Sequence, residues 1–182
     1  FALDLKRQGR LRKDTVVGTV MSNFGFELAM KEAGITLVRT AVGDRYILER
    51  MVADQYNLGG EQSGHMIFLD YHTSGDGLIS GLQMLKLMRR TGQPLSKLAD
   101  CMKAVPQVLL GVKVPRKPDL QALPLLQQAI REKEQVLNGT GRILVRYSGT
   151  EPLLRVMVEG QDAAMIQTIA EDLVNVVKSC IQ

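Results

Sequence analysis

The first hundred residues alternate short β-branched runs with segments of helical periodicity, and this alternation restricts the fold more than any other feature. Strand-like runs at residues 15–21 and 35–40 are each followed by a helix-like segment, and a strand pair covers residues 58–61 and 65–69. Strands that alternate with helices at this spacing favour a mostly parallel sheet packed between helices. We therefore predict a mixed, mostly parallel, three-layer α/β domain.

Capping residues mark where the helices of this domain begin. Ser22 or Asn23 is available to cap a helix over residues 25–33, and Asp44 is available to cap the next one. Asp76 is interpreted as the cap of a further amphipathic helix. That helix carries Leu78, Leu82 and Leu85, with Ile79 and Met88, at helical spacing.

The pattern changes after Val105-Pro106. A strand over residues 108–114 is followed by a helix over 120–137, two strands over 142–147 and 153–159, and a final helix that Asp162 is placed to cap. This order predicts a small α+β domain, an antiparallel sheet with helices on one face. We expect two domains, residues 1–104 and 105–182.

The charge distribution argues against a nucleic-acid partner. The chain has a net charge of +4 and a pI of about 9.2, but the basic residues are dispersed apart from one short run in residues 6–13. The two cysteines and two histidines show no zinc-site spacing. No apolar run reaches the roughly 20 residues that span a bilayer, and residues 1–13 are too polar for a signal peptide, so we expect a cytoplasmic protein without a membrane partner.

The first segment that carries chemistry is the polar, glycine-flanked stretch Gly59 to His65. A carboxylate and a hydroxyl two residues apart on an extended chain face the same way, so Glu61 and Ser63 suit vicinal sugar hydroxyls. A polar connection between strands is the alternative. Ser63 as an esterase nucleophile is disfavoured, because the spacing does not match a Gly-x-Ser-x-Gly elbow.

The second segment runs from Arg146 to Pro152 and is followed by Arg155. A tight loop with hydroxyls, successive backbone N–H groups around Gly149 and flanking guanidinium groups is typical of a phosphate site. Arginine suits this role because its planar fork holds phosphate bidentately. A hairpin turn with incidental basic residues remains the alternative.

A third segment, residues 42–46, lies at a strand-to-helix junction, where a helix N-terminus can contribute to an anion or hydroxyl site. Arg45 is its candidate ligand-binding residue. Arg45 is equally consistent with a surface position or with pairing to an acidic neighbour.

Together these segments resemble the α-D-phosphohexomutase family. Residues 60–65, Gly-Glu-Gln-Ser-Gly-His, look like its sugar-binding loop, and residues 146–152, Arg-Tyr-Ser-Gly-Thr-Glu-Pro, look like its phosphate-binding loop. Residues 19–23, 42–46 and 67–76 most resemble the branch of the family that acts on glucosamine phosphates. The resemblance covers essentially the whole chain.

The resemblance implies an enzyme that interconverts glucosamine 6-phosphate and glucosamine 1-phosphate, on the way to peptidoglycan precursors, through a phosphoserine and a bisphosphate intermediate. It implies a sugar-binding role for residues 1–104 and a phosphate-binding role for residues 105–182. The substrate-binding residues it implies are Glu61, Ser63, His65 and Arg45, with His65 as a possible catalytic auxiliary. The phosphate-binding residues are Arg146, Ser148, Gly149, Thr150 and Arg155.

Two family motifs are missing from the sequence: the Ser-His-Asn-Pro loop that carries the phosphoserine and the Asp-x-Asp-x-Asp loop that holds Mg²⁺. The chain also opens on Phe1 and reads at first like the tail of a helix. We therefore expect an inactive fragment that binds no metal itself. Its partners would be a hexosamine phosphate and the missing N-terminal domains. A homodimer is a possible assembly of the longer enzyme. The alternative is an autonomous anion- or nucleic-acid-binding module without catalysis.

Overall fold

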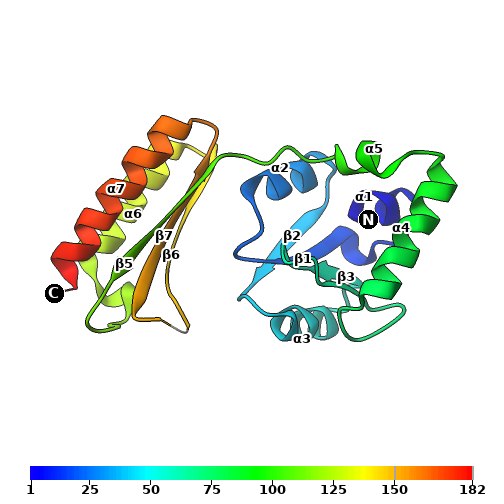
Figure 1. Cartoon of the computed structure of the whole chain (residues 1–182), viewed down its shortest axis with the longest axis horizontal. Coiled ribbons are helices and arrows are strands. Elements are labelled where there is room, and N and C mark those ends of the chain that lie inside the picture. The colour runs from blue at the N-terminus through cyan, green and yellow to red at the C-terminus, as the bar shows by residue number, and fades with distance from the viewer. Residues whose placement is uncertain (150, 182) are drawn as a thin grey trace. The chain divides into compact units, whose positions relative to one another are not determined.

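The computed structural model describes residues 1–149 and 151–181. The chain divides into two compact units, residues 1–104 and residues 105–182, and each unit is described by itself. Figure 1 shows the elements of both units along the chain.

The first unit is built on a four-stranded sheet with the order β2-β1-β3-β4. Its strands are β1 (Thr15–Thr19), β2 (Thr36–Thr40), β3 (Leu58–Gly60) and β4 (Met66–Phe68). Strand β1 runs parallel to both β2 and β3, whereas β3 and β4 form an antiparallel pair. The predicted mixed, mostly parallel sheet is confirmed.

Helices cover both faces of this sheet. They are α1 (Ala2–Arg7), α2 (Phe24–Glu32), α3 (Asp44–Asp54), α4 (Gly77–Thr91) and α5 (Leu95–Ala99), with a short 3-10 turn, η1, at Arg12–Asp14. Residues of α1 and α2 pack around Val16 and Leu58 on one face. Residues of α3 pack around Val17 and Ile67 on the other, and Figure 1 shows α2 and α3 on opposite sides of the strands.

Two of the predicted helix caps in this unit are confirmed and one is wrong. The Asn23 side chain accepts a hydrogen bond from Gly25 N, and Asp76 accepts one from Ile79 N. Asp44 does not cap α3. Gly43 occupies that position with φ +130°, a conformation that favours glycine, and Asp44 is the first residue inside the helix.

Fewer apolar side chains of α3 and α4 are buried than their helical spacing alone predicts. Ile47 and Met51 of α3 are buried, but Tyr46 and Val52 are exposed. Helix α4 contributes Leu87 and Ile79 to the interior. Three of its leucines, Leu78, Leu82 and Leu85, are instead exposed.

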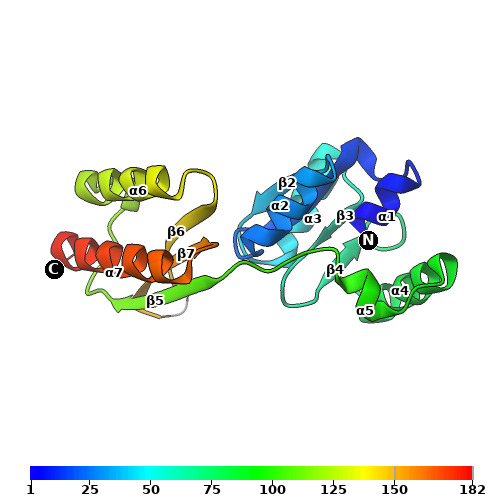
Figure 2. The same ribbon diagram turned by 90° about the horizontal axis from the view of Figure 1, so that it is seen from above.

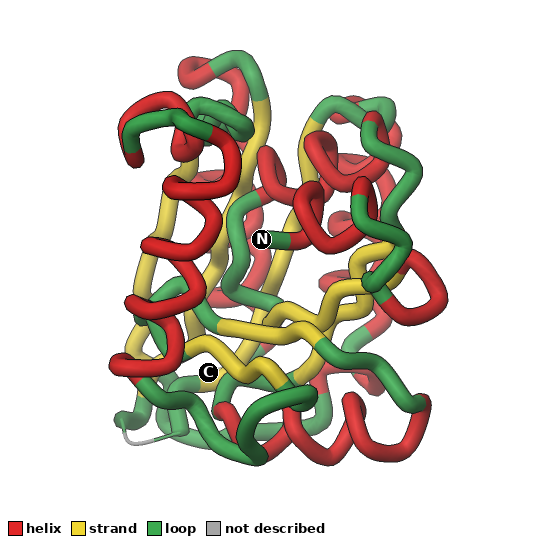
Figure 3. The backbone as a smooth tube through the Cα atoms, turned by 90° about the vertical axis from the view of Figure 1, so that its right-hand side faces the viewer, coloured by secondary structure: helices red, strands yellow, loops and turns green. Residues whose placement is uncertain are grey.

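The second unit is a three-stranded antiparallel sheet with the order β5-β7-β6. Its elements are β5 (Gln107–Lys113), the 3-10 turn η2 (Leu120–Ala122), α6 (Pro124–Leu137), β6 (Gly141–Tyr147), β7 (Leu153–Gly160) and α7 (Ala163–Cys180). Both helices pack on one face of the sheet, as Figure 2 shows, so the predicted α+β arrangement is confirmed. The succession of strands and helices can be followed along the tube in Figure 3.

Local signals explain where the helices of this unit begin. The Asp162 side chain accepts hydrogen bonds from Ala164 N and Met165 N, which confirms it as the cap of α7. The helix expected over residues 120–137 is divided at Leu123 into η2 and α6. Pro124 accounts for the break, because proline fits the first turn of a helix but not its interior.

Within the described residues, no helix is both long and apolar enough to cross a membrane.

Candidate functional site

The loop between β3 and β4 is a tight turn. Glu61 N donates to the His65 carbonyl at 2.9 Å, Gly64 N donates to the Glu61 carbonyl at 3.1 Å, and Gly64 has φ +95°. The expectation of an extended chain between Glu61 and Ser63 is therefore wrong. Gly59, near the end of β3, is also needed for packing, since a Cβ there would lie 2.6 Å from both Ile47 and Met51.

The Glu61 carboxylate is fixed from two sides. Gly43 N, at the start of α3, donates to its Oε1 at 2.7 Å, and the Ser63 hydroxyl donates to its Oε2 at 3.2 Å. Only 12% of the Glu61 side chain is exposed. A carboxylate at a helix N-terminus is stabilised by the orphan N–H groups and the helix dipole, so this acceptor is held in place before any ligand arrives.

His65 completes this group, which we call the Glu61 cluster (Glu61, Ser63 and His65). Its Nδ1 lies 3.9 Å from Glu61 Oε2, and 63% of its side chain is exposed. Gly75 lies close to His65, since a Cβ added to Gly75 would lie 3.4 Å from His65 Cβ. Three of the predicted substrate-binding residues are thus adjacent.

A pocket of about 290 Å³ opens beside the Glu61 cluster. Glu61 and Gln62 line it together with the apolar side chains of Phe26, Met66 and Met102. It lies where β1 and β3 end, and ligands of open α/β sheets bind at the carboxyl ends of parallel strands.

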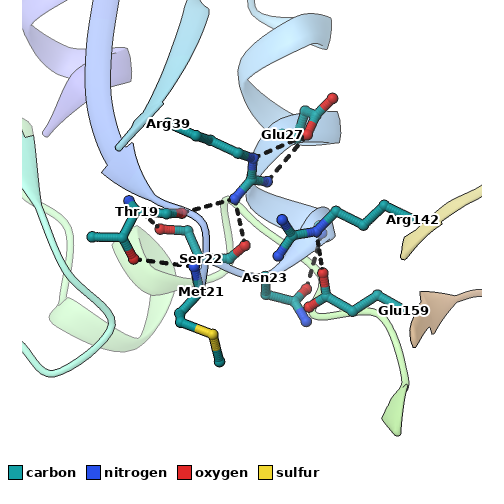
Figure 4. A network of polar contacts seen from close by, with 9 residues as sticks. Thr19, Met21, Ser22, Asn23, Glu27, Arg39, Arg142 and Glu159 are labelled. Atoms are coloured by element: carbon teal, nitrogen blue, oxygen red, sulfur yellow. Dashed lines mark hydrogen bonds and ion pairs between the residues drawn. The ribbon is translucent and has the colours of Figure 1, made fainter. Parts of the chain in front are cut away.

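Arg39 organises the neighbouring loop that follows β1, a role the sequence analysis did not detect. Its guanidinium donates to the carbonyl oxygens of Thr19 at 3.0 Å and Ser22 at 2.7 Å, and it pairs with Glu27 at 3.1 Å. Figure 4 shows these contacts converging on one side chain. Residues 19–23 therefore have a fixed conformation, although no motif in the sequence marks Arg39.

Arg45 lies two residues after Gly43, in the first turn of α3, and its side-chain hydrogen bond goes to Glu49 rather than to the Glu61 cluster. Its Nε donates to Glu49 Oε1 at 2.7 Å along the helix, and 80% of its side chain is exposed. The hydrogen bond to Glu49 raises the pKa of Arg45 above its ordinary value. Of the roles left open for Arg45, the structure shows the pairing with an acidic neighbour.

In the second unit, the loop between β6 and β7 centres on Ser148, which is buried. Ser148 N donates to the Leu153 carbonyl at 2.8 Å. The Glu151 carboxylate accepts from the Ser148 hydroxyl at 3.4 Å and from Arg155 Nη2 at 3.0 Å. The loop thus gathers a hydroxyl and a guanidinium around a carboxylate oxygen. The predicted residue Thr150 lies outside the described residues.

The two predicted arginines are brought together by strand register. Arg146 of β6 lies directly opposite Arg155 of β7, so both side chains stand on the same face of the sheet. Arg142 lies four residues before Arg146 on β6 and donates to the buried Glu159 at 2.5 Å, as Figure 4 shows. The spacing between Arg146 and Arg155 in sequence gives no direct indication of this pairing.

Lys117 is a second contact of this loop that sequence reasoning missed. Its Nζ donates to the Ser148 carbonyl at 2.9 Å and lies 5.9 Å from the centroid of the Tyr147 ring. Tyr147 OH donates to the Pro118 carbonyl at 2.7 Å. The segment after β5 is therefore bonded to the end of β6.

The described residues of this chain do not form a metal site. Across residues 1–149 and 151–181, no group of three or more His, Cys, Asp or Glu side chains is arranged to hold a metal ion.

The fold of the two units and their two polar loops indicate a family of proteins, and comparison with known families identifies which one. Residues 1–105 match "Phosphoglucomutase/phosphomannomutase, alpha/beta/alpha domain III", and residues 109–176 match "Phosphoglucomutase/phosphomannomutase, C-terminal domain". The chain therefore belongs to the phosphoglucomutase/phosphomannomutase family, which confirms the resemblance seen in its motifs.

Within this family the chain is similar to curated phosphoglucosamine mutases. It is 53% identical to that of Syntrophotalea carbinolica over 177 residues, which cover 97% of this chain and 39% of the relative. It is 55% identical to that of Shouchella clausii over 174 residues, covering 96% of this chain and 39% of the relative. The chain thus spans about two fifths of the length of these relatives.

Solved structures of distant relatives share the fold. An Aspergillus fumigatus N-acetylphosphoglucosamine mutase matches with a TM-score of 0.79 at 20% identity, covering 98% of this chain and 42% of that one. A complex of the Aspergillus fumigatus enzyme with GlcNAc-6P and magnesium matches with a TM-score of 0.76 at 21% identity, covering 97% of this chain and 44% of that one.

Proposed function

We propose that this chain is the substrate-binding C-terminal part of a phosphoglucosamine mutase, which interconverts glucosamine 6-phosphate and glucosamine 1-phosphate in the cytoplasm. The observation that carries the proposal is the identity of 51 to 55% with curated phosphoglucosamine mutases over nearly the whole chain. The family match and the loop geometry agree with it.

The Glu61 cluster is proposed to hold the sugar. The Glu61 carboxylate, fixed by Gly43 N and Ser63, accepts hydrogen bonds from ring hydroxyls, and the Ser63 hydroxyl donates or accepts. His65 is exposed enough to contact the ligand. Since vicinal hydroxyls are recognised pairwise, the cluster binds the sugar in either of the orientations that a mutase needs.

The loop between β6 and β7 is proposed to hold the phosphate that is not being transferred. Arg146, Arg155 and the Ser148 hydroxyl supply charge-assisted hydrogen bonds, with the backbone at Gly149 and the predicted Thr150 completing the loop. Contacts of this kind fix the position of a dianion, and positioning is a large part of catalysis in phosphoryl transfer.

The chemical step is assigned to the parent enzyme. Its phosphoserine donates a phosphoryl group to the free hydroxyl of the sugar phosphate, the resulting bisphosphate turns over, and the other phosphoryl group returns to the serine. Neither the serine loop nor the Mg²⁺ loop of the family occurs in this sequence. We therefore propose that the chain binds substrate without turnover.

A mutase assay on the 182-residue chain and on a longer parent tests this function. We expect the parent to convert glucosamine 6-phosphate and the chain to bind it without conversion. Turnover by the chain alone would contradict the proposed division of labour. Sequence-independent nucleic-acid binding with a steep salt dependence would instead support the alternative module.

Replacing Glu61 by glutamine is expected to weaken glucosamine 6-phosphate binding by about tenfold, because the sugar hydroxyls lose a charged acceptor. Inorganic phosphate binding should not change, since the phosphate is proposed to bind in the other unit. Isothermal titration calorimetry measures both affinities. Glu32→Gln, which neutralises an exposed carboxylate at the end of α2, is the matched control, and an equal loss for both ligands argues against a sugar-specific role.

Replacing Arg45 by alanine is expected to lower glucosamine 6-phosphate affinity by about threefold, the effect of one exposed charge–charge contact. Arg50 offers a matched control because it makes the equivalent pair with Asp54 on the same helix, at 2.6 Å. Arg50→Ala should leave the affinity unchanged. If the two variants behave alike, Arg45 serves only its pair with Glu49.

A further inference from the structure

The segment that follows β5 braces the phosphate loop at several points. Val114 N donates to the Pro152 carbonyl at 3.1 Å, on the far side of the loop. Lys117 Nζ donates to the Ser148 carbonyl at 2.9 Å, on the near side. The Lys117 contact joins residues 31 apart in sequence, and Val114 and Pro152 are further apart still, so both contacts are set by the tertiary fold of this unit.

Tyr147 strengthens this bracing. Its ring lies 5.9 Å from Lys117 Nζ, within the range of a cation–π contact, and its hydroxyl donates to the Pro118 carbonyl at 2.7 Å. Burial raises the pKa of Tyr147 above its ordinary value, and the nearby Asp119 raises it further. Lys117, Pro118, Tyr147 and Ser148 together form what we call the Lys117 clasp.

The clasp controls the direction of a backbone N–H group. The peptide bond between Ser148 and Gly149 is planar and trans, because no cis peptide occurs among the described residues. In a trans peptide the carbonyl of one residue and the N–H of the next point in opposite directions. By holding the Ser148 carbonyl, Lys117 therefore turns the Gly149 N–H away from itself.

We propose that Lys117 is a positioning residue of the phosphate site: it orients the Ser148–Gly149 peptide so that the Gly149 N–H faces the phosphate, and it adds positive charge beside the loop. This role rests on the proposed phosphate-binding function of the same loop. Lys117 lies outside the loop motif and about 30 positions before Ser148.

The test uses the full 182-residue chain and three variants. Lys117→Met keeps the length of the stem but removes the donor and the charge, and Lys117→Arg restores both. Lys133→Met removes the same charge from α6, where Lys133 pairs with Asp172 on the helical side of the sheet. Amide ¹H–¹⁵N spectra are recorded without ligand and during titration with inorganic phosphate and with glucosamine 6-phosphate, and thermal melts confirm folding.

For Lys117→Met we expect shifted Gly149 and Ser148 amide signals without ligand, unchanged strand signals, and affinity for both ligands reduced about tenfold. Lys117→Arg should recover most of the affinity, and Lys133→Met should match the unmodified chain. Unchanged Gly149 signals, or unchanged affinity despite shifted signals, would overturn the proposal. If the unmodified chain binds neither ligand, the proposed function fails. The positioning role is tested separately, because ligand-free spectra of Lys117→Met that show no change at Gly149 would overturn it.

Discussion

Replacing Arg146 by alanine is expected to weaken binding of glucosamine 6-phosphate and of inorganic phosphate alike, by about 10- to 100-fold. The guanidinium stands at the end of β6, directly opposite Arg155 and two residues before Ser148. An arginine fork can hold a phosphate through two parallel hydrogen bonds, which alanine cannot replace. Isothermal titration calorimetry at fixed ionic strength measures the loss.

A matched variant separates this effect from a general loss of charge. Arg131 lies exposed on α6, so Arg131→Ala changes the net charge equally and should leave both affinities within about twofold of the unmodified chain, as exposed charges far from a ligand are screened. Unchanged binding by Arg146→Ala would remove the basis for placing the phosphate at this loop.

The second large effect is expected on stability, from Gly141→Ala at the start of β6. A Cβ at this position would lie 2.2 Å from the Glu159 carbonyl oxygen and 3.0 Å from Leu137 Cδ2. The first neighbour is backbone of the paired strand, so the β6–β7 ladder must shift. Overpacking of this kind costs about 3 kcal/mol, which we expect as a lower free energy of unfolding in urea titrations.

Gly111→Ala is the control for this substitution, because it lies in the same sheet on β5. The nearest atom to its added Cβ is Leu153 Cδ2 at 4.0 Å, an ordinary contact distance. We expect a change of less than about 1 kcal/mol, since removing a strand glycine also lowers the entropy of the unfolded chain. Equal losses in the two variants would show that glycine at Gly141 is not required by close packing.

Local patterns were sufficient to predict the architecture. The alternation of strands and helices predicted the mixed sheet. Asp76 and Asp162 act as the caps they were predicted to be, and of the two candidates Ser22 and Asn23 it is Asn23 that caps α2. Such signals act within a few residues, so they can be read from sequence. The prediction that Asp44 caps α3 was wrong because the cap position lies one residue earlier, where the backbone conformation favours Gly43.

The contacts that shape the candidate site are mostly long-range, and no local pattern encodes them. Arg39 reaches Thr19 and Ser22 from the neighbouring strand, and Lys117 reaches Ser148 from the segment after β5. The loop motifs indicated which residues carry chemistry. The partners that hold those residues became visible only once the strand register and the packing were known.

The register of β6 and β7 has a thermodynamic consequence. Like charges directly opposite on neighbouring strands repel, and Arg146 and Arg155 occupy such positions. Glu151 neutralises part of this charge through its ion pair with Arg155. A bound dianion would add to this neutralisation, so ligand binding and folding of this unit would be linked. On the proposed phosphate-binding function, a bound dianion would therefore stabilise this sheet against unfolding.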